Sequence, residues 1–177
     1  QDEFSKTNTK SFLGKVVDNW EMELNKISHK NIILTKLRIG IVFSKDGGFL
    51  KKLLFLNYLR VNPLISRGNQ WQSWIHIDDL VHATQFIISK KLNGLINLVS
   101  PNPCTNQDIS LKIIKLYKKP FFSFSIPSIV AKIPFQLIGI PDFFNEIIMN
   151  NQKVFPKKLI ESGFVFKFEN LKKIMTF

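Results

Sequence analysis

The sequence predicts an α/β fold with parallel strands, followed by a smaller α+β segment toward the carboxyl end. Apolar residues first recur at helical spacing, and β-branched and helical patterns then alternate along the chain. The last third is interrupted by prolines and contains only short patterns. Alternation of strand and helix is typical of a parallel sheet that helices cover on both faces.

The first part of the chain alternates helical and extended patterns. The segment 32–43 is almost continuously apolar and rich in β-branched residues, which suits a strand buried on both faces. In order, the predicted elements are a helix over residues 12 to about 28, a strand over 32–43, a turn at Gly47-Gly48, a helix over 49–59 and a loop over 60–69.

The middle of the chain continues the alternation. We predict a strand over residues 71–77, a helix that Asp78 caps, a turn at Asn93-Gly94 and a strand over 95–99. Thr105 and Asp108 have the spacing of a capping box, in which each side chain bonds the other's backbone N–H. A further helix is therefore predicted from there to about residue 117.

The final segment predicts a small α+β cap. We expect an extended stretch over 120–127, two short helices interrupted by Pro134 and Pro141, a helix over 156–162 and a strand over 164–168. The expected domains are therefore residues 1–100, with the parallel sheet, and residues 101–177, with the cap.

The charge and composition of the chain indicate which classes of partner and which compartment to expect. The net charge is +12, but only three of the 25 basic residues are arginine, and the lysines are scattered along the chain. We therefore expect no nucleic-acid partner. No apolar run approaches the roughly 18 residues of a membrane span, so none is expected. A single cysteine, Cys104, fits a reducing compartment, and we expect a cytoplasmic protein.

Three blocks of sequence resemble one family. They are Leu37 to Val42 (LRIGIV), Gln70 to Leu80 (QWQSWIHIDDL), and Asn151 to Leu159 (NQKVFPKKL) with SGF at 162–164. Together they resemble the atypical extended short-chain dehydrogenases/reductases, in the NAD-dependent epimerase/dehydratase-like group with its C-terminal domain of unknown function. The resemblance implies the C-terminal portion of a Rossmann-like NAD(P)-binding fold.

The residues of two motifs of that fold are absent from the sequence. No glycines have G-x-G-x-x-G spacing, the pattern that lets backbone N–H groups approach a pyrophosphate. We therefore expect a fragment, whose partner is the missing N-terminal half of the same fold. The family's catalytic Tyr and Lys positions fall, by the resemblance, at Leu13 and Val17, which cannot transfer a proton.

The resemblance implies a set of cofactor-binding residues near the nicotinamide. These are Arg38, Ile39, Gly40, Ile41 and His76, and Trp71 and Trp74 are the expected substrate-pocket residues. Alternatives stay open for several of them. Arg38 could instead form an internal salt bridge, His76 could be a buried residue that orders the turn into the next helix, and one of the two tryptophans could lie in the core.

The paired aspartates, and the cysteine and remaining histidines, can be explained without a catalytic or metal-binding role. Asp78 and Asp79 could be paired carboxylates for acid/base work, although a helix cap and first-turn acid explain them equally well. Cys104 has no adjacent histidine, and His29 and His82 lack ligand-spaced partners. We therefore propose no catalytic thiol and no metal site.

The functional expectation is an epimerase-like NAD(P)-binding oxidoreductase fold whose reaction is unknown. Its intact form would bind NADP or NAD and a small-molecule substrate, and this chain alone is not expected to bind the cofactor. Two alternatives are a non-catalytic interaction protein linked to cell or plastid division, and a decayed gene product without function.

Overall fold

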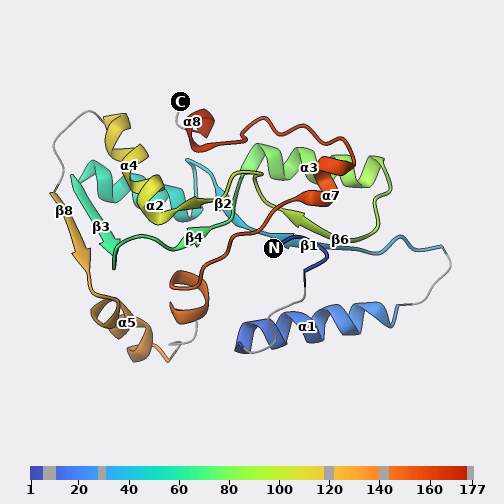
Figure 1. The fold of residues 1–177 in the computed structure, drawn as a ribbon, viewed down its shortest axis with the longest axis horizontal. Coiled ribbons are helices and arrows are strands. Elements are labelled where there is room, and N and C mark those ends of the chain that lie inside the picture. Colours follow the sequence, from blue (N-terminus) through green and yellow to red (C-terminus); the bar gives the residue numbers. More distant parts are fainter. Residues whose placement is uncertain (6–10, 28–30, 118–121, 140–143, 175–177) are drawn as a thin grey trace.

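The computed structural model describes residues 1–5, 11–27, 31–117, 122–139 and 144–174, and it is a mixed α/β structure (Figure 1). The elements are α1 (Phe12–Asn25), β1 (Thr35–Ile39), β2 (Ile41–Phe43), α2 (Gly48–Tyr58), β3 (Val61–Ile65), β4 (Trp71–Gln72), β5 (Trp74–His76), α3 (Ile77–Ser89), β6 (Gly94–Leu98), β7 (Cys104–Thr105), α4 (Asn106–Tyr117), β8 (Phe122–Ile126), α5 (Ser128–Leu137), the π-helical turn η1 (Phe144–Ile148), α7 (Lys157–Glu161) and α8 (Leu171–Ile174).

Parallel pairing dominates the strands. β1 pairs with β6, β2 with β5 and β3 with β8, all in parallel, while β4 and β7 form a short antiparallel pair. The predicted strand over 32–43 is thus divided at Gly40, where the chain changes partner from β6 to β5. Both β3–β8 and β4–β7 join residues on either side of the expected boundary at residue 100.

Two apolar clusters lie on opposite sides of β5. Trp74 packs with Phe43 and residues of α2 and α4, whereas Ile75 packs with residues of α3, β6 and α7. Both side chains are fully buried. Consecutive strand residues point to opposite faces, so this short strand contributes to both clusters.

The predicted strand over 71–77 is likewise divided, into β4 and β5, and Ile77 begins α3. Four further sequence predictions about elements are wrong, and three of them concern single residues or a loop. Residues 60–69 are not all loop, because Val61–Ile65 forms β3 against β8. The helix α5 is not interrupted at Pro134 but continues to Leu137, and the Pro134 carbonyl accepts a hydrogen bond from the amide of Ile138. Asp78 does not cap α3, since His76 does. Pro141, the other predicted interruption, lies outside the described residues.

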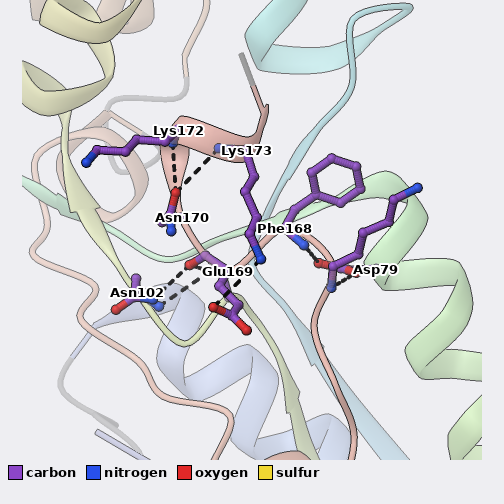
Figure 2. Close-up of polar contacts among 9 residues, drawn as sticks. Asp79, Asn102, Phe168, Glu169, Asn170, Lys172 and Lys173 are labelled. Atoms are coloured by element: carbon purple, nitrogen blue, oxygen red, sulfur yellow. Dashed lines mark hydrogen bonds and ion pairs between the residues drawn. The ribbon is translucent and has the colours of Figure 1, made fainter. Parts of the chain in front are cut away.

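The fourth is the predicted strand over residues 164–168, which is absent. The backbone N–H groups of residues 167 and 168 donate hydrogen bonds to a side chain rather than to a neighbouring strand. The buried Asp79 carboxylate accepts hydrogen bonds from the amides of Lys167 (2.9 Å) and Phe168 (2.8 Å), as Figure 2 shows for Phe168. The next carbonyl, of Glu169, accepts from the side chains of Ser100 and Asn102. These bonds fix the carboxyl-terminal tail across α3.

The capping box is confirmed. The Asp108 carboxylate accepts a hydrogen bond from the amide of Thr105 (2.9 Å), and the Thr105 hydroxyl accepts one from the amide of Asp108 (3.1 Å). Two otherwise unpaired N–H groups at the start of α4 are satisfied in this way.

The flank made by β1 and α1 is uncovered. In the described part of the chain, β1 has a strand partner on one edge only, and Leu37 and Ile39 are 39% and 54% exposed. The helix α1 buries none of its residues, and Trp20 is 68% exposed. Figure 1 shows α1 beneath β1 at the edge of the molecule. None of the described helices has the length and apolarity to cross a membrane.

Candidate functional site

A cavity of about 350 Å³ lies between α1 and the carboxyl end of β1. We call it the α1–β1 cleft. Residues from 1–5 and 150–154 contribute to its border, and the residues that line it include Leu13, Gly14, Val17, Arg38, Ile39 and Gly40. Ligands of open parallel sheets bind outside the carboxyl ends of strands, which is where this cleft lies.

Three of the five residues expected at a cofactor border the cleft. Arg38, Ile39 and Gly40 do so, and they are consecutive at the end of β1. Ile41 follows them in β2, where it packs against the cluster around Trp74. His76 lies on the far side of β2, paired with Phe43 in the strand register.

Arg38 lines the cleft and also forms an ion pair. Its Nε donates to Glu21 Oε1 (2.7 Å) and its Nη2 to Glu21 Oε2 (2.8 Å), so the contact is bidentate. Both side chains are less than a third exposed. The two possibilities that the sequence left open for Arg38 are therefore compatible, because the pair joins β1 to α1 on the wall of the cleft.

Gly40 is required by a close backbone approach. A Cβ atom at this position would lie 2.6 Å from the Ser73 carbonyl oxygen and 2.8 Å from Val99 Cγ1. The Gly40 amide donates to the Leu98 carbonyl, and the next amide, of Ile41, donates to that of Ser73. Three chain segments, around residues 40, 73 and 98–99, are thus in close contact at the cleft.

The start of α1 is held by a residue that the sequence did not single out. The Ser11 hydroxyl accepts from the amide of Gly14 (3.0 Å), and the two Glu146 carboxylate oxygens accept from the amides of Phe12 and Leu13, both at 2.8 Å. The hydrogen bond from Leu13 is the main cause that lowers the pKa of Glu146. Nothing local in the sequence signals this contact, because the partners are 133 and 134 positions apart.

Leu13 and Val17 face the same cleft. They occupy the positions at which the resemblance places the family's tyrosine and lysine, and both line the cavity. Neither side chain has a transferable proton. Tyr58, one of the two tyrosines, is 74% exposed on α2, away from the cleft-lining residues.

His76 ends a strand and caps a helix. Its Nδ1 accepts a hydrogen bond from the amide of Asp78 (3.2 Å), and its ring stacks on Phe168 with centroids 3.7 Å apart. Burial lowers the pKa of the imidazole, opposed by the nearby carboxylates of Asp78 and Asp79. These contacts match the ordering role considered for His76 from sequence.

The two tryptophans differ in their surroundings. Trp74 is fully buried, stacks on Phe43 at 5.3 Å and donates from Nε1 to the Asn102 carbonyl. Trp71 lies against the segment that borders the cleft, with Lys153 Nζ 4.2 Å from its ring and its amide donating to Asn151 Oδ1. Neither ring is among the residues that line the cavity.

The chain is similar in sequence to epimerase family proteins. No family model matches it. An epimerase family protein of Staphylococcus epidermidis is 32% identical over 162 residues, which are 91% of this chain and 52% of that protein. A relative from Staphylococcus aureus is 29% identical over 171 residues, which are 96% of this chain and 55% of that protein. The chain thus spans about half the length of the curated relatives it matches.

Solved structures share the fold. The human epimerase family protein SDR39U1, solved with NADPH, superimposes with a TM-score of 0.86 at 23% identity, over 99% of this chain and 57% of that one. A nucleoside-diphosphate sugar epimerase from Corynebacterium glutamicum gives 0.72 at 23% identity, over 99% of this chain and 32% of that one. The likeness to these solved structures shows that the chain shares their mixed α/β, Rossmann-like fold.

Proposed function

We propose that this chain forms the later part of an epimerase-like, NAD(P)-binding oxidoreductase, and that the α1–β1 cleft receives the nicotinamide end of the cofactor beside a small-molecule substrate. The observation that supports this most is the meeting of Arg38, Ile39 and Gly40 with Leu13 and Val17 around one cavity. The human structural neighbour was solved with NADPH, which agrees with a dinucleotide site.

The described residues suit the nicotinamide end of such a cofactor, but they offer no site for its pyrophosphate. Ile39 and Gly40 bring an apolar side chain and exposed backbone at the end of β1 to the cavity, which suits one face of a nicotinamide ring. The pyrophosphate has no glycine-rich turn to bind on this chain. When bound, the cofactor would accept or supply a hydride, and this chain would contribute shape and apolar contact from Leu13 and Val17 rather than proton transfer.

The preceding half of the same fold is the proposed partner of the uncovered flank. A strand from it would pair with the free edge of β1, and its helices would cover Trp20 on α1. Exposed apolar groups on both elements support this, as does the length of the relatives, about twice that of this chain. Burying these groups would remove apolar surface from water, which is favourable.

The test is NADPH titration of the native polypeptide that contains this chain, followed by cofactor fluorescence. Val17→Trp should fill the cleft and weaken NADPH binding at least about tenfold, because an indole takes the space of the nicotinamide. Ile88→Trp, at a 71% exposed site on α3, is the matched control and should leave binding unchanged. Absence of NADPH binding by the native polypeptide, or equal binding by both variants, would overturn the proposal.

A further inference from the structure

Two stretches of the sequence are basic and free of acidic residues. Residues 47–77 and 109–141 contain no aspartate or glutamate. Their basic residues are Lys51, Lys52, Arg60, Arg67, Lys112, Lys115, Lys118, Lys119 and Lys132. These nine positive charges are most of the net +12. The stretches include α2, β3, β8, α5 and nearly all of α4, which Figure 1 shows at the left-hand end of the molecule.

The helix α5 at this end presents apolar side chains to solvent. Ile129 and Leu137 are 80% and 82% exposed, and Val130 and Ile133 are about half exposed. Residues 129, 133 and 137 are spaced by four, so they form one stripe along the helix. A short apolar helix with so little burial gains almost none of the tertiary packing that normally stabilises a helix.

The strand β8 extends the apolar stripe. Phe122 is 71% exposed, Phe124 is 38% exposed, and their ring centroids are 5.5 Å apart. The Phe122 amide donates to the carbonyl of Arg60, two residues past the exposed Tyr58 that ends α2. We call the exposed apolar residues of these two elements the β8–α5 surface; they are Phe122, Phe124, Ile129, Val130, Ile133 and Leu137.

We propose that the β8–α5 surface docks on an anionic membrane surface. Charge complementarity points to this occupant, because the elements around this surface carry basic residues and no acidic ones within residues 47–77 and 109–141, and positive charge is attracted to anionic headgroups. The described basic side chains are Lys51, Arg60, Arg67, Lys112, Lys115 and Lys132. The protruding aliphatic groups of α5 would enter the boundary between headgroups and acyl chains, with the phenylalanines at its edge. Such a helix lies in the plane of the membrane surface and does not cross it.

Two other occupants fit the same surface less well. A second copy of the chain would bring two basic regions together, and like charges at an interface oppose association. A nucleic acid would be attracted by the charge, but exposed isoleucine, valine and leucine neither stack on bases nor bond phosphates. None of the six residues of the β8–α5 surface lines the α1–β1 cleft, so the two proposals rest on different residues.

The experiment is flotation of the full chain with vesicles of phosphatidylcholine alone and of phosphatidylcholine with phosphatidylserine in equal parts. We expect binding to the anionic vesicles only, weakened by added salt. The double variant Ile129→Gln/Leu137→Gln should lower partition into them at least about tenfold, since two aliphatic groups no longer enter the membrane. Both side chains are about four-fifths exposed, so the fold should be unaffected.

Control variants outside this surface show whether a loss of vesicle binding is specific to it. Ile88→Gln and Val165→Gln remove similarly exposed aliphatic groups, 71% and 82% exposed, from outside this surface and should retain wild-type partition. Failure to bind anionic vesicles, or equal partition of the double variant, would overturn the proposal. So would self-association without lipid that the double variant abolishes, as measured by sedimentation velocity, because the surface would then bind a second copy.

Discussion

Gly40 shows how one residue sets the shape of the cleft. The sequence predicted it to lie within a continuous strand and, by resemblance, near a cofactor. Its requirement for glycine comes from the Ser73 carbonyl, which is 33 positions away in the chain and whose oxygen would be only 2.6 Å from a Cβ atom at residue 40. A pattern of apolar residues cannot reveal such an approach, because it depends on how β1, β2 and β5 meet.

Gly40→Ala should therefore destabilise the protein by about 2–3 kcal/mol, since the added methyl group must displace backbone atoms. Gly47→Ala is the matched control, because nothing lies within 4 Å of a Cβ there, and its effect should stay within about 0.5 kcal/mol. Urea denaturation followed by circular dichroism gives both values. Similar midpoints for the two variants would show that the contact relaxes freely.

Asp79 is a second residue whose role only the structure reveals. From sequence it was a first-turn acid of α3 or half of a carboxylate pair, and it does lie in the first turn. Its carboxylate, however, belongs to a residue that is 1% exposed, and it accepts hydrogen bonds from residues 167 and 168. The side chain therefore connects the start of α3 to the carboxyl-terminal tail.

Asp79→Asn should lower stability by about 2–3 kcal/mol, because an amide offers one acceptor oxygen and turns an NH₂ group toward a backbone N–H. Asp78→Asn changes a half-exposed neighbour and should cost less than about 1 kcal/mol. Thermal unfolding of the two variants tests the difference. If Asp78→Asn proved the more damaging change, the tail would not depend on the Asp79 contact.

Cys104 should be chemically inert in the folded protein. Burial, with a smaller contribution from the Asp108 charge, raises the pKa of its thiol to about 12, so near pH 8 only about one thiol in ten thousand is ionised. We expect negligible reaction with an aromatic disulfide reagent under native conditions and full reaction after denaturation. Rapid labelling of the native protein would contradict this expectation.

At the scale of elements, local patterns identified most helices correctly. The helices α1, α2, α4 and α7 lie where apolar spacing, turns and the capping box predicted them. The strand β3 was missed because Pro63 has no amide hydrogen to donate and argues against a strand in sequence. Its existence depends on β8, whose residues lie about 60 positions later.

Glu146→Gln should loosen the start of α1, since an amide replaces a carboxylate that accepts from two backbone N–H groups. We expect faster hydrogen exchange at Phe12 and Leu13, whereas Glu161→Gln on α7 should leave those amides unchanged. Because the hydrogen bonds lower the pKa of Glu146 below its ordinary 4.5, its contribution is complete above that value and is lost as the pH falls through the lower folded pKa. Protection that does not depend on pH in this range would argue against the contact.

At the scale of the whole molecule, the chain offers one side of a cleft and an uncovered flank. The 177-residue chain alone should not bind NADPH with micromolar affinity, because it lacks the backbone turn that holds a pyrophosphate. Isothermal titration calorimetry of the purified chain checks this directly. A micromolar dissociation constant would mean that other groups of this chain bind the phosphates.

The sequence by itself determined the order of most elements and the absence of a glycine-rich turn and a Tyr/Lys pair, because these follow from local patterns and residue identity. Only the tertiary structure decided that Leu13 and Val17 face Arg38 and Gly40, that Glu146 holds α1, and that α5 is left exposed. The physical reason is that each of these features depends on contacts, or on their absence, between segments far apart in the chain. Such contacts do not produce a local pattern of residues that the sequence could reveal.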